Sequence, residues 1–177
     1  RAQPLLGAND GASGVAVLLE IARLLGESDP PVGVDIVLFD CEDYGEEGST
    51  RDYILGSRHH AASLAGRRPS AVVVVDMVGE RGVRLPIEGF SEAASPGLVS
   101  SIYAVAADIG AAGFIRERGP AIIDDHFPFI QAGIPAVDII DFDYPFWHTL
   151  ADTPDKCAPE SLDAVGEVLV RFVWGAR

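Results

Sequence analysis

Residues 71–77 read Ala-Val-Val-Val-Val-Asp-Met, and this stretch decides the fold class. Four consecutive valines are typical of a strand that is covered on both faces, as the strands of parallel sheets are. Residues 32–40 and 136–140 also read as strands, and residues 82–87 read as an edge strand. The chain therefore contains several candidate strands for one sheet.

Segments with helical periodicity lie between these strands. We expect helices over residues 13–25, 57–65, 96–109, 125–132 and 159–174, the first of which should stop at Gly26. Strands that alternate with helices predict a mostly parallel sheet with helices on both faces. With 177 residues, the chain fits one α/β domain over residues 1–177.

Composition excludes several classes of partner. The net charge of -14 leaves little basic surface to neutralise nucleic-acid phosphates or to bind an anionic membrane. No apolar run approaches the roughly 20 residues that span a bilayer. The two cysteines, Cys41 and Cys157, form no metal-binding spacing. They are either a disulfide pair or two lone thiols, and the sequence leaves this open, as it does the oligomeric state.

Acidic residues follow three of the predicted strands. Residues 40–43 read Asp-Cys-Glu-Asp, Asp76 ends the valine strand, and Asp141 and Asp143 follow the strand at 136–140. Ligands of such sheets bind beyond the carboxyl ends of the strands. We therefore expect the functional site at that edge of the sheet.

Asp10 lies in the segment 7–14, Gly-Ala-Asn-Asp-Gly-Ala-Ser-Gly, directly before the first helix. A simple interpretation is that Asp10 caps this helix. In a functional interpretation, the helix dipole keeps the carboxylate ionised, as a metal ligand must be. Both interpretations place Asp10 at the same point of the fold.

Glu42 and Asp43 are adjacent acids after a strand, so their side chains point in different directions. One can bind a metal while the other moves a proton, which is the division that metal-assisted chemistry needs. The next acids, Glu46 and Glu47, are expected in a solvated loop.

His148 follows an acidic, aromatic loop, as expected for an imidazole ligand. Two carboxylates and one histidine leave a fourth zinc position open. The other histidines have structural interpretations: His59 and His60 lie on a presumed helix surface, and His126 is a cap or a core histidine. No compact metal motif supports the set, because its members are far apart in the sequence.

Together, these segments resemble the zinc aminopeptidase and glutaminyl cyclase family. The resemblance begins with residues 7–14 and 19–23, and continues through residues 42–43, 55–59, 76–79, 124–126, 133–135 and 147–149. It covers essentially the whole chain. It implies an α/β/α sandwich on a mixed, mainly parallel sheet, of the zinc exopeptidase type.

The resemblance also implies roles for residues. It assigns Asp10, Asp43 and His148 as zinc ligands and Glu42 as the general base and acid. Asp76 and Asp124 correspond to supporting catalytic acids of the cyclases, and Trp147 and His126 are expected to bind the substrate.

Two activities fit the resemblance, both on the N-terminus of a peptide or small aminoacyl substrate. A glutaminyl cyclase uses one zinc, whereas an aminopeptidase can use two, with Asp10 bridging and Asp76 binding the second. The segments at 124–126 and 147–148 favour the cyclase slightly. Asp43 in place of a longer Glu, and the loop 143–146, depart from the cyclase pattern. A metal-free binding domain is the remote alternative.

The second aminopeptidase metal also uses a histidine upstream of Arg1. We therefore expect the chain to be an N-terminally truncated bacterial member of the family. By the same resemblance, we expect an extracytoplasmic location, either secreted or periplasmic.

Overall fold

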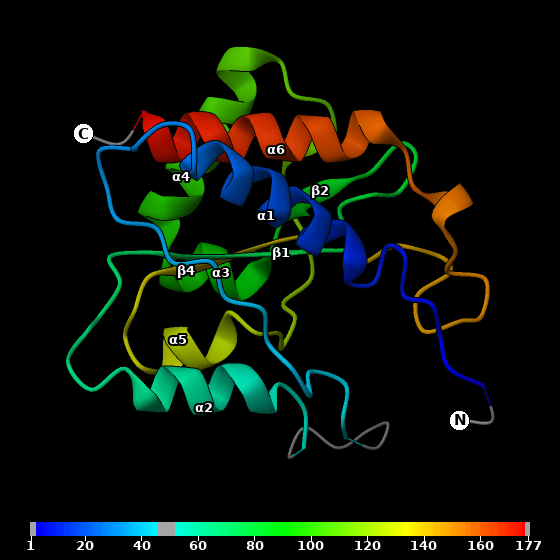
Figure 1. The fold of residues 1–177 in the computed structure, drawn as a ribbon, viewed down its shortest axis with the longest axis horizontal. Coiled ribbons are helices and arrows are strands. Elements are labelled where there is room, and N and C mark those ends of the chain that lie inside the picture. The colour runs from blue at the N-terminus through cyan, green and yellow to red at the C-terminus, as the bar shows by residue number, and fades with distance from the viewer. Residues whose placement is uncertain (1–2, 46–51, 176–177) are drawn as a thin grey trace.

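The computed structural model describes residues 3–45 and 52–175 of the chain (Figure 1). Glu46 and Glu47, expected in a solvated loop, lie outside these residues. The elements in chain order are α1 (Ala12–Leu25), α2 (Leu55–Ser63), β1 (Val72–Asp76), β2 (Leu85–Ile87), α3 (Gly89–Ala94), α4 (Pro96–Ile109), β3 (Phe114–Arg118), α5 (Phe127–Gln131), β4 (Ala136–Ile140), the 3-10 turn η1 (Pro154–Lys156) and α6 (Pro159–Trp174).

The strands pair in parallel, as predicted. β1 pairs with β4 from Val72 opposite Ala136 to Asp76 opposite Ile140. β2 pairs with β3, also in parallel, with an irregularity after Pro86. All five residues of β4 are buried, as expected for a strand covered on both faces. An isolated antiparallel bridge joins Glu80 to Cys157.

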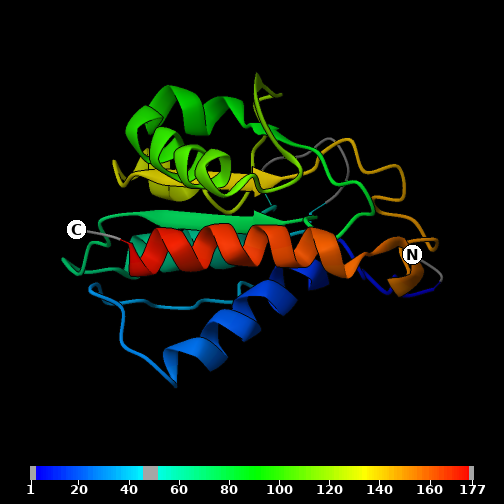
Figure 2. The ribbon, with the colours of Figure 1, turned by 90° about the horizontal axis from the view of Figure 1, so that it is seen from above.

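Helices cover both faces of the β1–β4 pair, and this confirms the three-layer α/β/α arrangement. In Figure 1, α1, α4 and α6 lie on one side of these strands, and α2 and α5 lie on the other. The view from above shows α6 running alongside β1 (Figure 2). One core cluster joins Val17, Val165 and Val168 to the sheet. A second, around Phe129, lies under α2 and α5.

Local sequence explains why α6 and α1 form and pack on the same side of the β1–β4 pair. In α6, the buried residues Ser161, Val165, Val168 and Leu169 recur at helical spacing after a proline in the first turn. In α1, Gly14 lies against the backbone of Val75, where a side chain would clash with the carbonyl oxygen. The N-terminus of α1 therefore meets the carboxyl end of β1, where the site is expected.

The strand expected over residues 32–40 is wrong, because this segment forms no strand. A strand needs a hydrogen-bonded neighbour, and the described residues provide no ladder for it. Its apolar residues still pack against the core, since Ile36 contacts one core cluster and Phe39 contacts the other. Leu38 remains 56% exposed.

Three elements were not predicted: the 3-10 turn η1, β3 and α3. β3 reads Phe-Ile-Arg-Glu-Arg and has mainly exposed side chains, so it lacks an apolar pattern. α3 begins at a buried cap, because the Glu88 carboxylate accepts hydrogen bonds from the backbone N–H groups of Phe90 and Ser91. The other predicted elements are confirmed with shifts of their ends; the strand expected from residue 82 begins at Leu85.

Candidate metal centre

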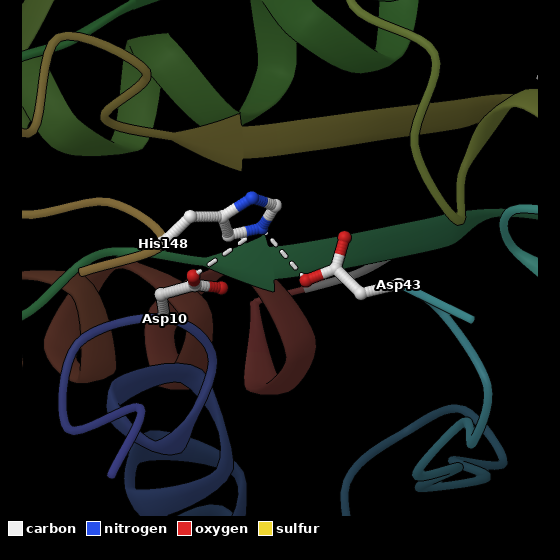
Figure 3. A group of neighbouring side chains, drawn as sticks. All are labelled: Asp10, Asp43 and His148. Carbon is white, nitrogen blue, oxygen red and sulfur yellow. Dashed lines mark ion pairs between the residues drawn. The ribbon is translucent and has the colours of Figure 1, made fainter. Parts of the chain in front are cut away.

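Asp10, Asp43 and His148 come together at the edge of the sheet, from three segments of the chain (Figure 3). One ligand atom from each lies within 4.8 Å of the other two. Nε2 of His148 is 2.7 Å from Oδ2 of Asp43 and 3.7 Å from Oδ2 of Asp10. The structure thus places the three expected ligands around one point.

Asp10 does not cap α1. The N-cap residue is Gly11, and no side chain makes a capping hydrogen bond there. The Asp10 carboxylate instead points toward His148 (Figure 3). The pKa of Asp10 is raised, chiefly by burial, and the nearby imidazole of His148 offsets part of this shift. The capping interpretation is therefore wrong. The position of the carboxylate fits a metal ligand, but its raised pKa does not show the effect expected of the helix dipole.

The backbone of Glu42 and Asp43 is fixed by the start of α2. Ile54 donates its N–H to the Glu42 carbonyl at 2.8 Å, and Leu55 donates to the Cys41 carbonyl at 3.2 Å. These bonds hold the two adjacent acids in different orientations. Asp43 faces His148, and Glu42 faces the acids described next.

Three residues beside the site have left-handed backbone conformations: φ is 54° at Cys41, 48° at Met77 and 56° at His148. Residues other than glycine rarely adopt this region, and such strain gathers at functional sites. Each of the three belongs to the site or directly adjoins Glu42 or Asp76. Ile54 and Ala65 are the other described non-glycine residues with positive φ, so three of the five lie at the expected site.

Glu42, Asp76 and Asp124 form one acidic cluster, as expected. Burial, and then the charges of Asp124 and Asp43, raises the pKa of Glu42 to about 9. Burial and the charge of Asp124 raise the pKa of Asp76 well above its ordinary value. Burial also raises the pKa of Asp124. Because like charges this close cannot all ionise cheaply, the metal-free cluster holds at least one proton at neutral pH.

This cluster predicts how stability depends on pH when metal is removed. The folded pKa of Glu42 is about 9, whereas that of an unfolded Glu is about 4.3. The folded state therefore binds the proton more tightly, and this stabilisation is lost as pH rises between those values. We expect the melting temperature of chelator-treated protein to fall over that range. In Glu42→Gln, calorimetry should show a smaller fall; an equal fall would contradict the raised pKa.

His126 does not lie where a substrate-binding residue is expected. Its side chain is fully buried, with Nε2 3.0 Å from Oε2 of Glu88 and Nδ1 3.7 Å from Oδ2 of Asp138. Burial alone would raise the pKa of Glu88, but hydrogen bonds, that of His126 foremost, lower it to about 2. The geometry thus supports a core histidine, and gives no support to substrate contact.

A cavity of about 630 Å³ opens onto the metal centre. Its walls include Gly7, Asp10, Asp43, His148 and Asp152, together with residues 3–6. Trp147 is not part of this wall.

Trp147 is 40% exposed and lies beside the metal centre. It stacks on His148, with ring centroids 4.2 Å apart. It is therefore not a core tryptophan. Its exposed ring remains available beside the histidine, as an apolar surface.

Three buried acids that contribute to this region were not predicted. Asp138 is the one charged residue in the apolar strand β4, and a charge in such a strand could have indicated a buried acid from the sequence. Glu88 and Asp152 lie in loops whose sequence gives no sign of burial, yet each is only 2% exposed.

Cys41 and Cys157 are both free thiols.

The ligand set suits zinc. Zinc bonds to carboxylate oxygen and imidazole nitrogen are about 2.0–2.2 Å long, so ligands of one ion lie up to about 4.4 Å apart. The observed spread within 4.8 Å is close to that limit. Fold and ligands together define an α/β enzyme class that uses zinc bound by carboxylates and histidine.

The chain belongs to peptidase family M28, whose profile matches residues 1–173. Glutaminyl-peptide cyclotransferase of Bos taurus is 27% identical to it, over 95% of this chain and 56% of that protein. The chain thus spans about half the length of this curated relative. Among the described helices, none is long and apolar enough to cross a membrane.

Solved structures of both activities share the fold. Glutaminyl cyclase of Porphyromonas gingivalis superimposes with a TM-score of 0.91 at 40% identity, covering 96% of this chain and 66% of that one. A leucine aminopeptidase precursor of Bacteroides thetaiotaomicron gives 0.94 at 36% identity, covering 99% and 64%. The likeness therefore confirms the family and fold, and both activities occur among the similar proteins.

Proposed function

We propose that this protein is a zinc-dependent glutaminyl-peptide cyclotransferase, which converts an N-terminal glutamine into pyroglutamate and releases ammonia. The observation that carries the proposal is the acidic cluster beside the metal centre. Burial and the neighbouring acids raise the pKa of Glu42 to about 9 in the metal-free protein. A zinc ion bound beside it would lower this pKa toward neutrality, where a carboxyl group can both accept and release a proton. Burial also raises the pKa values of Asp76 and Asp124, which adjoin Glu42.

The reaction transfers one proton within the substrate. The α-amino nitrogen attacks the γ-amide carbon, a C–N bond forms, and the bond to the amide nitrogen breaks. A bound zinc ion would polarise the amide carbonyl as a Lewis acid. Glu42 accepts the proton from the α-amine and delivers it to the departing ammonia. Asp76 and Asp124 orient Glu42 and keep its pKa high, and Asp10, Asp43 and His148 would hold the metal.

An aminopeptidase is the second candidate, supported by the likeness to the leucine aminopeptidase precursor. In that case Glu42 would activate water, and Asp76 would bind a second zinc beside Asp10. Burial, the charge of Asp124 and then that of Asp10 raise the pKa of Asp76, and the contribution of Asp10 supports this alternative.

Mass spectrometry of one peptide distinguishes the two activities. The zinc-loaded protein is incubated with a peptide that begins with glutamine, and its products are identified. We expect the pyroglutamyl peptide and ammonia. Free glutamine and a shortened peptide would instead support the aminopeptidase. An extracytoplasmic location also remains part of this proposal, on the strength of the family resemblance.

Trp147 provides a prediction about substrate choice. Its exposed ring beside His148 offers an apolar wall and one N–H donor to a folded glutamine side chain. The two methylene groups of a glutamine side chain are worth about 0.8 kcal/mol each when they are buried against the ring, so Trp147→Ala should lower cyclisation by about tenfold with zinc still bound. Trp147→Phe keeps a wall without the donor and should recover part of the rate. Normal cyclisation by both variants would contradict this role.

A further inference from the structure

We propose that Asp152 is a positioning residue that fixes Asp10 relative to His148 and thereby sets the affinity of the metal centre. The inference rests on the zinc site of the proposed function. Asp152 is 2% exposed. It is neither one of the expected metal ligands nor one of the acids expected to move a proton.

The Asp152 carboxylate binds the backbone that carries Asp10. Oδ1 accepts the N–H of Asn9 at 2.9 Å, and Oδ2 accepts the N–H of Asp10 itself at 3.1 Å. Hydrogen bonds to a charged acceptor are about twice as strong as neutral ones. Both oxygens are thus occupied, which explains why Asp152 lines the cavity without belonging to the ligand group.

Asp152 also belongs to the turn that carries His148. Its own N–H donates to the Thr149 carbonyl at 3.3 Å, and Thr149 donates in turn to the Phe146 carbonyl at 3.0 Å. The hydroxyl of Tyr144, at the start of the same loop, donates to Oδ1 at 2.7 Å. One buried side chain therefore connects the segment of Asp10 with the loop that carries His148.

The other bonds to the Asp10 segment lead elsewhere. Oδ1 of Asn9 accepts the N–H of Gly79 at 2.7 Å, and Ser13 links the Asn9 carbonyl to the N–H of Val78. These neutral bonds attach the segment to the end of β1. Among the described contacts, the Asp152 bonds attach it to the histidine loop. Their loss should therefore change the distance between the ligands more than the fold.

The test is Asp152→Asn, compared with the parent protein by chelator competition for zinc. The amide of Asn replaces one acceptor by a donor, which then faces a backbone N–H. Loss of such an outer partner typically costs 10–100-fold in metal affinity, and we expect a loss in that range. The absorption spectrum of the cobalt-substituted protein should also change, because it reports ligand geometry.

Asp141→Asn is the matched control. Asp141 is also 2% exposed and accepts two backbone N–H groups, that of Arg84 at 2.8 Å and that of Asp143, but neither donor is a metal ligand or the sequence neighbour of one. It should destabilise the fold without changing zinc affinity or the cobalt spectrum. Equal zinc affinities in the two variants would overturn the inference.

Tyr144→Phe keeps the test decisive if Asp152→Asn does not fold. It leaves the carboxylate in place but removes one of its three partners, so zinc affinity should fall less, in the same direction. Unchanged affinity and an unchanged cobalt spectrum would then overturn the inference. Zinc affinity does not depend on which reaction the protein catalyses, so failure of the cyclase assignment leaves this result interpretable.

Discussion

Glu42→Gln is expected to lower turnover by roughly 10² to 10⁴, the usual contribution of a positioned acid or base, while zinc remains bound. Glutamine keeps the shape of the side chain but carries no titrating proton. Glu42 is not a member of the ligand group, which consists of Asp10, Asp43 and His148. The variant therefore separates proton transfer from metal binding.

Two measurements are needed for this variant. Steady-state rates on a peptide with N-terminal glutamine give the loss of activity, and metal analysis after dialysis gives the zinc content. Near-normal turnover with full zinc content would remove Glu42 from the mechanism. A parallel loss of zinc would show that Glu42 acts as a ligand, and the assignment of roles to Glu42 and Asp43 would have to change.

His148→Ala is expected to have the second large effect, on metal binding. His148 is the one nitrogen ligand of the set and the residue that both carboxylates approach, at 2.7 and 3.7 Å. Loss of an outer-shell partner already costs about 10–100-fold in metal affinity, so loss of a ligand should cost more. Chelator competition should show this, and activity should fall with it at any zinc concentration that leaves the variant metal-free.

His60→Ala provides the control for this variant. His60 lies in α2, 5.6 Å from the ring of Phe39 and 6.0 Å from that of Phe129, and it belongs to no metal group among the described residues. Zinc affinity should be unchanged. Equal weakening in the two variants would mean that histidine content, rather than the centre at His148, determines zinc binding.

The sequence predicted the elements whose burial follows a regular pattern. The period of α6 and the valines of β1 arise from contact with one core, so they can be read locally. Residues 32–40 show the limit of this reading, because their pattern is strand-like while a strand depends on a neighbour. β3 was missed for the opposite reason: it pairs through its backbone while its side chains remain polar.

The site was predictable to the extent that ligands follow strands. Of the three ligands, only His148 follows a strand that forms, β4; Asp10 was recognised before the first helix, and Asp43 after a segment, 32–40, that is not a strand. The family resemblance selected these residues among the other acids and histidines. Asp152 and Glu88 were not found. Both carboxylates accept backbone N–H groups that lie beside them only in the folded chain. A loop sequence does not show which backbone groups an acid will contact. The family resemblance assigned His126 to the substrate, whereas its side chain is fully buried in the core.

Anomalous scattering at the zinc absorption edge, from crystals of the zinc-loaded protein, tests the central claim most directly. The account predicts a strong peak about 2.0–2.2 Å from carboxylate oxygens of Asp10 and Asp43 and from Nε2 of His148, with Glu42 adjacent but unbound. A second peak at Asp76 would favour the aminopeptidase. A peak only at other residues, or no peak between these three ligands, would contradict the account.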